Sequence, residues 1–376
     1  MESLSASELG AIAIKEAVLR ANILKQDVES VIMGTVLQGG QGQIPSRQAA
    51  VKADLPWEVK TDTINKVCAS GLRSVTLADQ MIRAGDEEIV VAGGMESMSN
   101  APYILQDARF GMQMGNFLLK DLMLEDGLTC SFTGVHMGVY GERVAKELQI
   151  SRGEQDKWAL RSHTEAIRAL QTKVFSEEII PVEVQGHKGE KILFTQDENI
   201  REDTTLEKLS KLKPVFEQGG RITAGNAPGV NDGAGALVLM SGERATKEKH
   251  RPAAIILGHA EIAMEAKDFP KTPGLVIQKL LQKTGKTLEQ IDLFEINEAF
   301  ALVTLATIKL VGIEPEKVNV NGGAIALGHP IGASGARIII TLIHELNRRG
   351  GGIGIAAICS GSGQGDAIMI EVPKSL

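Results

Sequence analysis

The hexapeptide Cys68-Ala69-Ser70-Gly71-Leu72-Arg73 recurs later in the chain as Gly332-Ala333-Ser334-Gly335-Ala336-Arg337. The second copy begins 264 positions after the first (332 − 68). Two more pairs of segments align at the same separation: Leu9-Gly10 with Pro273-Gly274, and 89–94 with 353–358. Three matches in one register predict a duplicated chain, and therefore a fold with two similar halves.

The two copies differ where a chemical reaction would need them to differ. The first copy begins with a thiol, Cys68, whereas the second begins with Gly332 and follows Gly328-His329-Pro330. A nucleophilic thiol needs a base within reach. A duplicated scaffold that supplies a cysteine from one half and a histidine from the other would meet this need.

Composition favours an ordinary globular enzyme. The chain has 376 residues and a mass of 40.2 kDa, with 43% hydrophobic and 23% charged residues. Its net charge of −7 argues against a nucleic-acid surface, and no apolar run approaches the roughly 18 residues of a membrane span. Three cysteines and no secretory signal pattern favour a reducing compartment, so we expect a cytoplasmic protein that binds neither nucleic acid nor membrane.

Strand and helix patterns alternate along both ends of the chain, which predicts an α/β fold with a largely parallel sheet. We expect an N-terminal half formed by residues 1–98 together with 229–250. Residues 99–228 have no counterpart in the repeat and are interpreted as an inserted loop domain. Residues 251–376 form the expected C-terminal half.

Cys68 is predicted to lie between a strand and a helix. The partial positive charge of a helix N-terminus lowers the pKa of a nearby thiol, so Cys68 is a candidate nucleophile. A small buried core thiol is the alternative. His329 lies in a glycine-rich loop just before a helix, and Pro330 favours an extended conformation for it. His329 is therefore a candidate acid or base, with a structural histidine as the alternative.

Two more side chains follow predicted strands of the second half. Cys359 ends the strand 353–358, and a second thiol there could shuttle protons. Asn297 follows the strand 293–296 and could orient a water or a carbonyl, or could instead cap a helix. Cys130 has no such setting and is interpreted as structural. The histidines lack paired metal-ligand spacing, so no metal site is expected.

Together, Cys68, Asn297-Glu298-Ala299-Phe300, the stretch 321–335 and Cys359-Ser360-Gly361 closely resemble the motifs of the thiolase family over nearly the full length. The resemblance implies two five-stranded halves, stacked as α-β-α-β-α layers, with an inserted loop domain. It also implies acyl transfer between coenzyme A thioesters. No permanently bound cofactor is implied, because coenzyme A is substrate or product.

The resemblance implies a role for each matching residue. Cys68 would be acylated, and His329 would activate it and bind a thioester oxygen. Cys359 would be the acid or base at the α-carbon of the second acyl group. Asn297 would hold a water that completes an oxyanion site with His329, and the amides of Cys68 and Gly361 would form the other.

The inserted segment is implied to bind coenzyme A and the acyl group. The loop around His136-Met137 resembles that of short-chain thiolases, where the pair closes the acyl pocket; methionine as packing filler is the alternative. Pro228 departs from the family, where serine often contacts coenzyme A. Six pocket residues are implied: Leu128, His136, Met137, Arg201, Phe216 and Ala224.

The expected activity is that of an acetyl-CoA C-acetyltransferase. It joins two molecules of acetyl-CoA into acetoacetyl-CoA by a ping-pong reaction, and also runs the reverse thiolysis. A 3-ketoacyl-CoA thiolase of broader range, from fatty acid degradation, is one alternative. A decarboxylating ketoacyl synthase and a non-catalytic acyl-CoA-binding relative are two others. Resemblance to the short-chain enzymes also implies a homotetramer, a dimer of dimers.

The repeat raises one further expectation. The predicted strand 253–257 of the second half precedes its first helix, and its counterpart in the first half would fall before Met1. We expect this strand to be central in the thiolase sheet. On that basis the first strand of the N-terminal half is missing and the chain is less stable as written.

Overall fold

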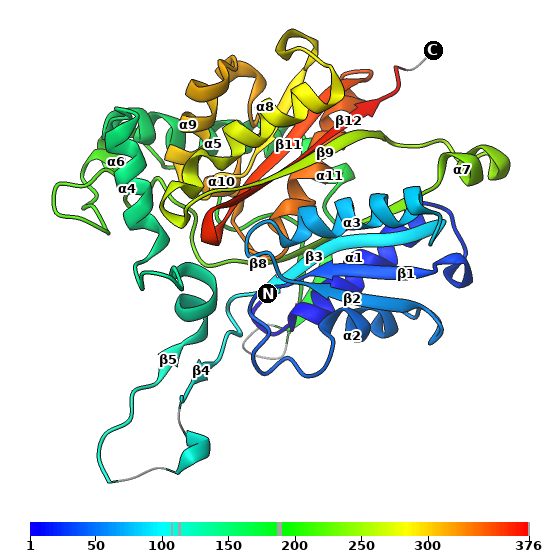
Figure 1. The fold of residues 1–376 in the computed structure, drawn as a ribbon, viewed down its shortest axis with the longest axis horizontal. Coiled ribbons are helices and arrows are strands. Elements are labelled where there is room, and N and C mark those ends of the chain that lie inside the picture. The colour runs from blue at the N-terminus through cyan, green and yellow to red at the C-terminus, as the bar shows by residue number, and fades with distance from the viewer. Residues whose placement is uncertain (107, 112–113, 186–189, 375–376) are drawn as a thin grey trace.

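The fold is built on two β-sheets that face each other across a shared helical layer (Figure 1). The computed structural model describes residues 1–106, 108–111, 114–185 and 190–374. The first sheet lies in the blue and cyan part of the chain, with β8 added from the green part. The second sheet lies in the yellow to red part. Both predicted halves are therefore present.

The first sheet has the strand order β2-β1-β3-β8. Strands β1, β2 and β3 are parallel, and β8 runs antiparallel to β3. The strands are β1 (Ser30–Gly34), β2 (Lys60–Ile64), β3 (Ile89–Ser97) and β8 (Asp232–Met240). The helices of this half are α1 (Ala6–Arg20), α2 (Pro45–Lys52), α3 (Ser70–Ala84) and, after β8, α7 (Gly242–Glu248).

The second sheet repeats this pattern with the order β10-β11-β12-β9. Strands β10 and β11 are parallel, while β12 runs antiparallel to both β11 and β9. The strands are β9 (Ile255–Ala263), β10 (Leu293–Ile296), β11 (Gly352–Ser360) and β12 (Gln364–Val372). The helices are α8 (Thr272–Thr284), α9 (Ala301–Val311), α10 (Ala324–Leu327) and α11 (Ser334–Arg348).

The layers follow the predicted α-β-α-β-α arrangement. Helices α3 and α11 pack against each other and against both sheets, and a single apolar core joins their side chains to those of the strands. Helices α1 and α2 cover the outer face of the first sheet, and α8 and α9 cover the outer face of the second. Helices α3 and α11 begin and end 264 residues apart, as the repeat predicts.

The glycines of the repeated hexapeptide explain how closely the two central helices approach. A Cβ atom on Gly335 would lie 2.3 Å from the backbone nitrogen of Leu72. A Cβ atom on Gly71 would lie 2.8 Å from the backbone nitrogen of Ala336. Both distances are too short for a side chain, so the equivalent glycines let the two helix N-termini meet.

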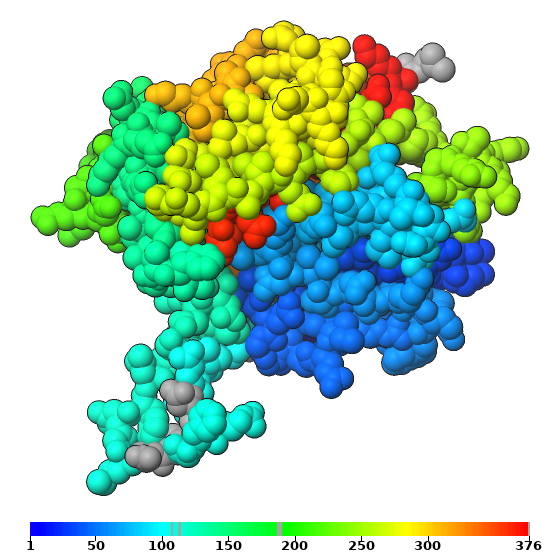
Figure 2. Space-filling model, in the orientation of Figure 1, coloured from blue at the N-terminus to red at the C-terminus, as the bar shows by residue number. Residues whose placement is uncertain are grey.

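The inserted segment forms the outer part of the molecule beside both halves (Figure 1). Helix α5 follows Ser151, which forms the predicted capping box with Glu154. An arm that carries β4 and β5 projects away from the body, as Figure 2 also shows. The elements are β4 (Tyr103–Ile104), β5 (Lys120–Asp121), α4 (Met137–Glu147), α5 (Arg152–Gln171), the hairpin β6 (Val182–Gln185) with β7 (Lys191–Phe194), and α6 (Leu206–Ser210).

The prediction of a central first strand is wrong. Strand β9, which begins the second half, lies at the edge of its sheet and pairs with β12 alone. Its counterpart in the first sheet would lie beside β8 and would have a single neighbour, so the expected loss of backbone pairing on two sides does not arise. Each sheet also has four strands among the described residues rather than five. At the outer edge of β10 a lone parallel bridge, Phe294 with Val318, takes the place of a strand.

None of the described helices combines the length and the apolar character needed to cross a membrane.

Candidate active site

Cys68 lies in a tight turn between β2 and α3. The preceding residue, Val67, has a φ of 45°, which is unusual for a β-branched side chain and marks a constrained backbone. Ser70 holds the turn closed, because its Oγ accepts from the backbone N–H of Lys66 at 2.8 Å and donates to the Val67 carbonyl at 2.6 Å. The repeated serine of the hexapeptide therefore fixes the position of the candidate nucleophile.

The sulfur of Cys68 lies near two backbone amides, that of Gly361 and its own. These amides favour the thiolate, but burial outweighs them and raises the pKa of the Cys68 thiol to about 12. The expectation of a lowered pKa from the helix N-terminus is therefore wrong in direction. The same two amides are the pair that the sequence resemblance assigned to an oxyanion site.

His329 is buried and held on three sides. Its backbone N–H donates to Asn231 Oδ1 at 2.8 Å, Nδ1 lies 2.6 Å from Ser334 Oγ, and Nε2 lies 3.4 Å from Asn297 Nδ2. Burial, and then the charge of Arg337, lower the pKa of His329 to about 3. The imidazole is therefore neutral near pH 7 and can accept a proton.

Cys359 lies near the end of β11 and is 1% exposed. Burial, followed by the charge of Cys68, raises the pKa of the Cys359 thiol well above its usual value. This effect of the Cys68 charge on Cys359 indicates that the two sulfurs are near each other. Asn297, at the end of β10, is fully buried, and its Oδ1 has no partner among the described residues. That oxygen is available to a ligand or a water. The structure therefore brings Cys68 together with Gly361 and Cys359, and brings His329 together with Asn297.

Polar contacts tie the two halves together around this site. Lys66 forms ion pairs with Asp366 at 2.7 Å and with Glu261, and its carbonyl accepts from Ser360 Oγ at 2.5 Å. A second contact between the halves involves Glu96, near the end of β3. Its side chain is fully buried and accepts from the backbone N–H of Gly332 at 2.9 Å. Three donors of the loop that follows β1 complete the surroundings of Glu96: the Thr35 hydroxyl and the amides of Val36 and Leu37.

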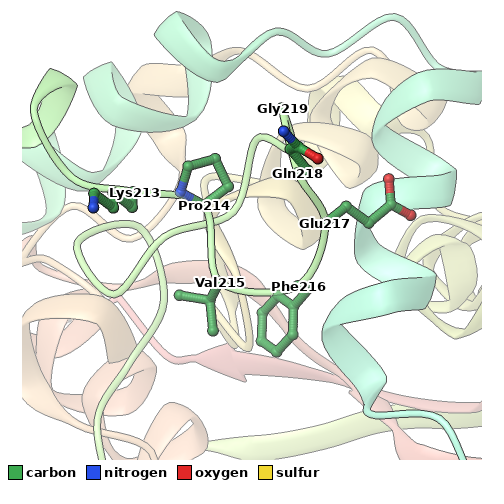
Figure 3. Close-up of a pocket in the computed structure, with 7 residues that line it drawn as sticks. All are labelled: Lys213, Pro214, Val215, Phe216, Glu217, Gln218 and Gly219. Atoms are coloured by element: carbon green, nitrogen blue, oxygen red, sulfur yellow. The ribbon is translucent and has the colours of Figure 1, made fainter.

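Three of the predicted pocket residues lie around one aromatic cluster. The rings of His136 and Phe216 are stacked at 4.6 Å, and Phe216 meets Phe300 edge-on at 6.0 Å. Met137 packs in the same apolar cluster as Cys359. Phe216 also lines a surface pocket of about 350 Å³ within the loop Lys213–Gly219 (Figure 3). This pocket shares Phe216 with the aromatic cluster, and Cys68 is not among the residues that line it.

The other three predicted pocket residues lie outside this aromatic cluster, and two of them are exposed. Leu128 ends a short helical turn, Met123–Leu128, and is half-buried. Ala224 is exposed in a turn whose Asn226 carbonyl accepts from the N–H of Ala301, at the start of α9. Arg201 is exposed, and its backbone N–H donates to His163 Nδ1 at 3.2 Å. The contacts of the described residues do not join Arg201 to the cysteines.

Sequence reasoning missed several residues that hold the site in place. Glu298 accepts four hydrogen bonds in the core, at 2.8–3.1 Å, from Trp158, Ser162, Asn319 and the amide of Ile325. Asn231, Glu96 and Ser334 were missed as well. The repeated Ala-Ser-Gly was the available signal for Ser334, whereas nothing local marks a buried carboxylate whose donors are distant in sequence.

Among the described residues, no group of three or more His, Cys, Asp or Glu side chains is arranged to hold a metal ion. The site instead combines two neighbouring thiols, the half-buried Cys68 and the buried Cys359, with a pair of amides. The fold and this site define a duplicated α/β protein whose two halves each contribute a cysteine to one centre.

Comparison with known proteins agrees with that description. The sequence matches the family description "Thiolase, N-terminal domain" over residues 1–243 and "Thiolase, C-terminal domain" over residues 250–372. This chain belongs to the thiolase family, as its motifs predicted.

Individual relatives are similar over nearly their whole length. An acetyl-CoA acetyltransferase of Chromobacterium violaceum is 47% identical over 99% of this chain and 95% of its own, and one of Cupriavidus necator is 47% identical over 99% and 94%. The crystal structure of the Bacillus anthracis acetyl-CoA acetyltransferase superposes with a TM-score of 0.96 at 40% identity, covering 99% of this chain and 94% of that one. The Acat5 thiolase from Ascaris suum, solved in complex with coenzyme A, gives 0.94 at 40% identity and covers 99% and 95%.

Proposed function

We propose that this protein is an acetyl-CoA C-acetyltransferase, which condenses two acetyl-CoA into acetoacetyl-CoA and free coenzyme A and also catalyses the reverse thiolysis. The observation that carries the proposal is the proximity of two thiols from different halves, Cys68 and Cys359, in a chain whose buried His329 is neutral. Relatives that are 47% identical over nearly the full length and bear the name acetyl-CoA acetyltransferase support it.

In the first half-reaction Cys68 gives its proton to Nε2 of His329 as its sulfur attacks the carbonyl carbon of acetyl-CoA. The amides of Cys68 and Gly361 hold the oxyanion that develops. The tetrahedral intermediate collapses, and coenzyme A leaves as a thiolate that takes a proton from Cys359, while His329 keeps the proton of Cys68. An acetyl group remains on Cys68. Because one thioester replaces another, this step is close to thermoneutral.

In the second half-reaction Cys359, as a thiolate, removes a proton from the α-carbon of a second acetyl-CoA. The resulting enolate oxygen lies at His329 and a water held by Asn297. The carbanion attacks the acetyl carbonyl on Cys68, the amides of Cys68 and Gly361 again hold the oxyanion, and the sulfur of Cys68 leaves. The sulfur of Cys68 takes its proton back from His329, the proton removed from the substrate stays on Cys359, and acetoacetyl-CoA is released.

The raised thiol pKa values fit this division of labour. A thiol with a high pKa stays protonated until a substrate carbonyl accepts the electron pair, so proton transfer and attack occur together. Once deprotonated, Cys359 is a strong base, which suits removal of a proton from carbon. A negative charge on Cys68 would oppose the deprotonation of Cys359, and acetylation of Cys68 removes that charge.

The covalent step has a direct test. Incubation with acetyl-CoA and rapid acid quench should add one acetyl group to the peptide that contains Cys68, detected by mass spectrometry, and the peptide with Cys130 serves as an internal control. Cys68→Ser should lose at least roughly 1000-fold in thiolysis of acetoacetyl-CoA. A near wild-type rate in Cys68→Ser would refute the covalent mechanism, whereas a wild-type protein that shows neither adduct nor thiolysis would favour the alternative of a non-catalytic acyl-CoA-binding relative.

The acyl pocket is proposed to be short. His136, Met137 and Phe216 form an apolar wall in the cluster that also contains Cys359. A long acyl chain would have to displace this stacked pair. We expect a strong preference for acetoacetyl-CoA, and comparable kcat/KM values for a ten-carbon 3-ketoacyl-CoA would favour the broader-range thiolase. Arg201, Leu128 and Ala224 are proposed to contact coenzyme A, and Pro228 is proposed to weaken one such contact.

The protein is further proposed to be a cytoplasmic homotetramer that takes part in fatty acid metabolism. Apolar side chains on the projecting arm support assembly with further copies, since Phe110 is 90% and Leu118 is 77% exposed. Light scattering at micromolar concentration should give four times the chain mass. A monomeric mass would contradict the assembly. The proposed domain boundaries remain 1–98 with 229–250, 99–228 and 251–376.

A further inference from the structure

The two serines of the repeated hexapeptide, Ser70 and Ser334, are equivalent in the duplicated fold but have different partners. Ser70 begins α3 and Ser334 begins α11. Each donates its hydroxyl proton to a backbone carbonyl of the preceding turn, Ser70 to Val67 at 2.6 Å and Ser334 to Pro330 at 2.9 Å. The difference lies in what each oxygen accepts.

In the first half the oxygen of Ser70 accepts from the backbone N–H of Lys66. The residue 264 positions later is Pro330, which has no N–H to donate. The acceptor position on Ser334 is therefore not used by the backbone. Nδ1 of His329 occupies it instead, at 2.6 Å.

This arrangement determines where the proton of His329 lies. A hydroxyl has one proton, and a carbonyl can only accept, so the contact with Pro330 uses the Ser334 proton. The short contact with His329 can then be a hydrogen bond only if Nδ1 donates. The reverse arrangement would leave the two oxygens of Ser334 and Pro330 facing each other at 2.9 Å with no proton between them.

We propose that Ser334 is a positioning residue that holds His329 in the tautomer protonated on Nδ1 and leaves Nε2 free as the base. The inference deepens the proposed function and rests on it. Nε2 faces the side chain of Asn297. When the proton of Cys68 moves to Nε2, Nδ1 keeps its proton, so Ser334 continues to accept from the imidazolium and stabilises it. No other proton changes place.

The proton position can be measured without any reaction. In the full-length protein with ¹⁵N-labelled histidine at pH 7, the His329 signals are assigned by their loss in His329→Asn. We expect Nδ1 to show the shift of a protonated nitrogen and Nε2 that of a bare one. A spectrum with the proton on Nε2 would overturn the proposal whatever the variants do.

Variants then test whether Ser334 is responsible. Ser334→Ala should yield a mixture of tautomers and reduce the rate of Cys68 acetylation by about 10- to 100-fold, as expected for a buried donor without its acceptor, with little change in KM. Ser334→Thr keeps the hydroxyl and should restore both the spectrum and the rate. Ser74→Ala removes a buried hydroxyl that donates to the carbonyls of Gly71 and Gly93, and should change neither.

The outcomes separate this inference from the proposed function. Wild-type tautomer and rate in Ser334→Ala would overturn the role of Ser334. Loss of rate in Ser74→Ala equal to that in Ser334→Ala would show a general packing effect and would also overturn it. A protein with the expected tautomer that transfers no acetyl group would refute the proposed activity, while the role of Ser334 in fixing the proton would hold.

Discussion

The contact between the two central helices offers the sharpest test of how the fold positions the site. Replacing Gly335 by alanine adds a Cβ atom that would lie 2.3 Å from the backbone nitrogen of Leu72 and 2.8 Å from its Cβ. Because the first contact is with backbone, no side-chain rotation can relieve it. The helices α3 and α11 must move apart.

The size of the movement follows from these distances. Ordinary van der Waals contact begins near 3.4 Å, so the gap at Leu72 must open by about 1 Å. Gly335 lies next to Ser334, which contacts His329, and Leu72 lies one turn after Cys68. A displacement of this size between two reacting groups lowers a rate by roughly 100-fold, and overpacking destabilises a fold by about 1–3 kcal/mol.

The assay combines two measurements on Gly335→Ala. Stopped-flow mixing with acetyl-CoA gives the rate of Cys68 acetylation, and thermal unfolding gives the change in stability. Gly153→Ala is the matched control, since a Cβ atom at that position in helix α5 meets nothing within 4 Å and should stabilise by about 0.5–1 kcal/mol. Wild-type acetylation and wild-type Tm in Gly335→Ala would refute the reasoning, because the helices could then separate without moving the site.

Three further predictions concern buried polar groups. Alkylation of Cys68 by iodoacetamide should keep rising with pH beyond pH 9, because burial raises the pKa of this thiol to about 12, and a plateau near pH 9 would contradict this. Burial raises the pKa of Glu295 to about 8, so its folded form holds a proton that the unfolded chain loses above about 4.5. The free energy of unfolding should therefore fall as pH rises from about 4.5 to about 8, and Glu295→Gln should flatten that fall by on the order of 2 kcal/mol in urea titrations. Glu298→Ala should cost more than about 3 kcal/mol, since four buried donors lose their acceptor; equal Tm values for the variant and the wild type would refute this.

Much of the fold was predictable because the signals are local or periodic. The capping boxes at Ser5 and Ser151 marked the starts of α1 and α5, and apolar runs marked β3 and β11. The 264-residue register predicted that α3 and α11 are equivalent. The register could not place the first strand of each half in its sheet, because the order of strands depends on contacts between distant segments. This is why β9 was expected in the centre and lies at the edge.

In the candidate site, too, some residues could be found from the sequence and others could not. The identities of Cys68, His329, Cys359 and Asn297 were found from motifs, because their flanking glycines and strand ends lie nearby in the sequence. The supporting groups were not found, because Glu96 and Glu298 receive donors from segments tens to hundreds of residues away.

The order of residues along the chain was enough to show that this protein is duplicated and belongs to the thiolase family, and to predict that a cysteine and a histidine from different halves act together. These are properties of order along the chain, which a repeat or a motif records directly. The charge states of these groups depend instead on the folded surroundings. Burial of Cys68 outweighs the nearby amides, and the oxygen of Ser334 is left to His329 by a proline that lacks an N–H. Both effects depend on what surrounds a group in space, which no local pattern contains.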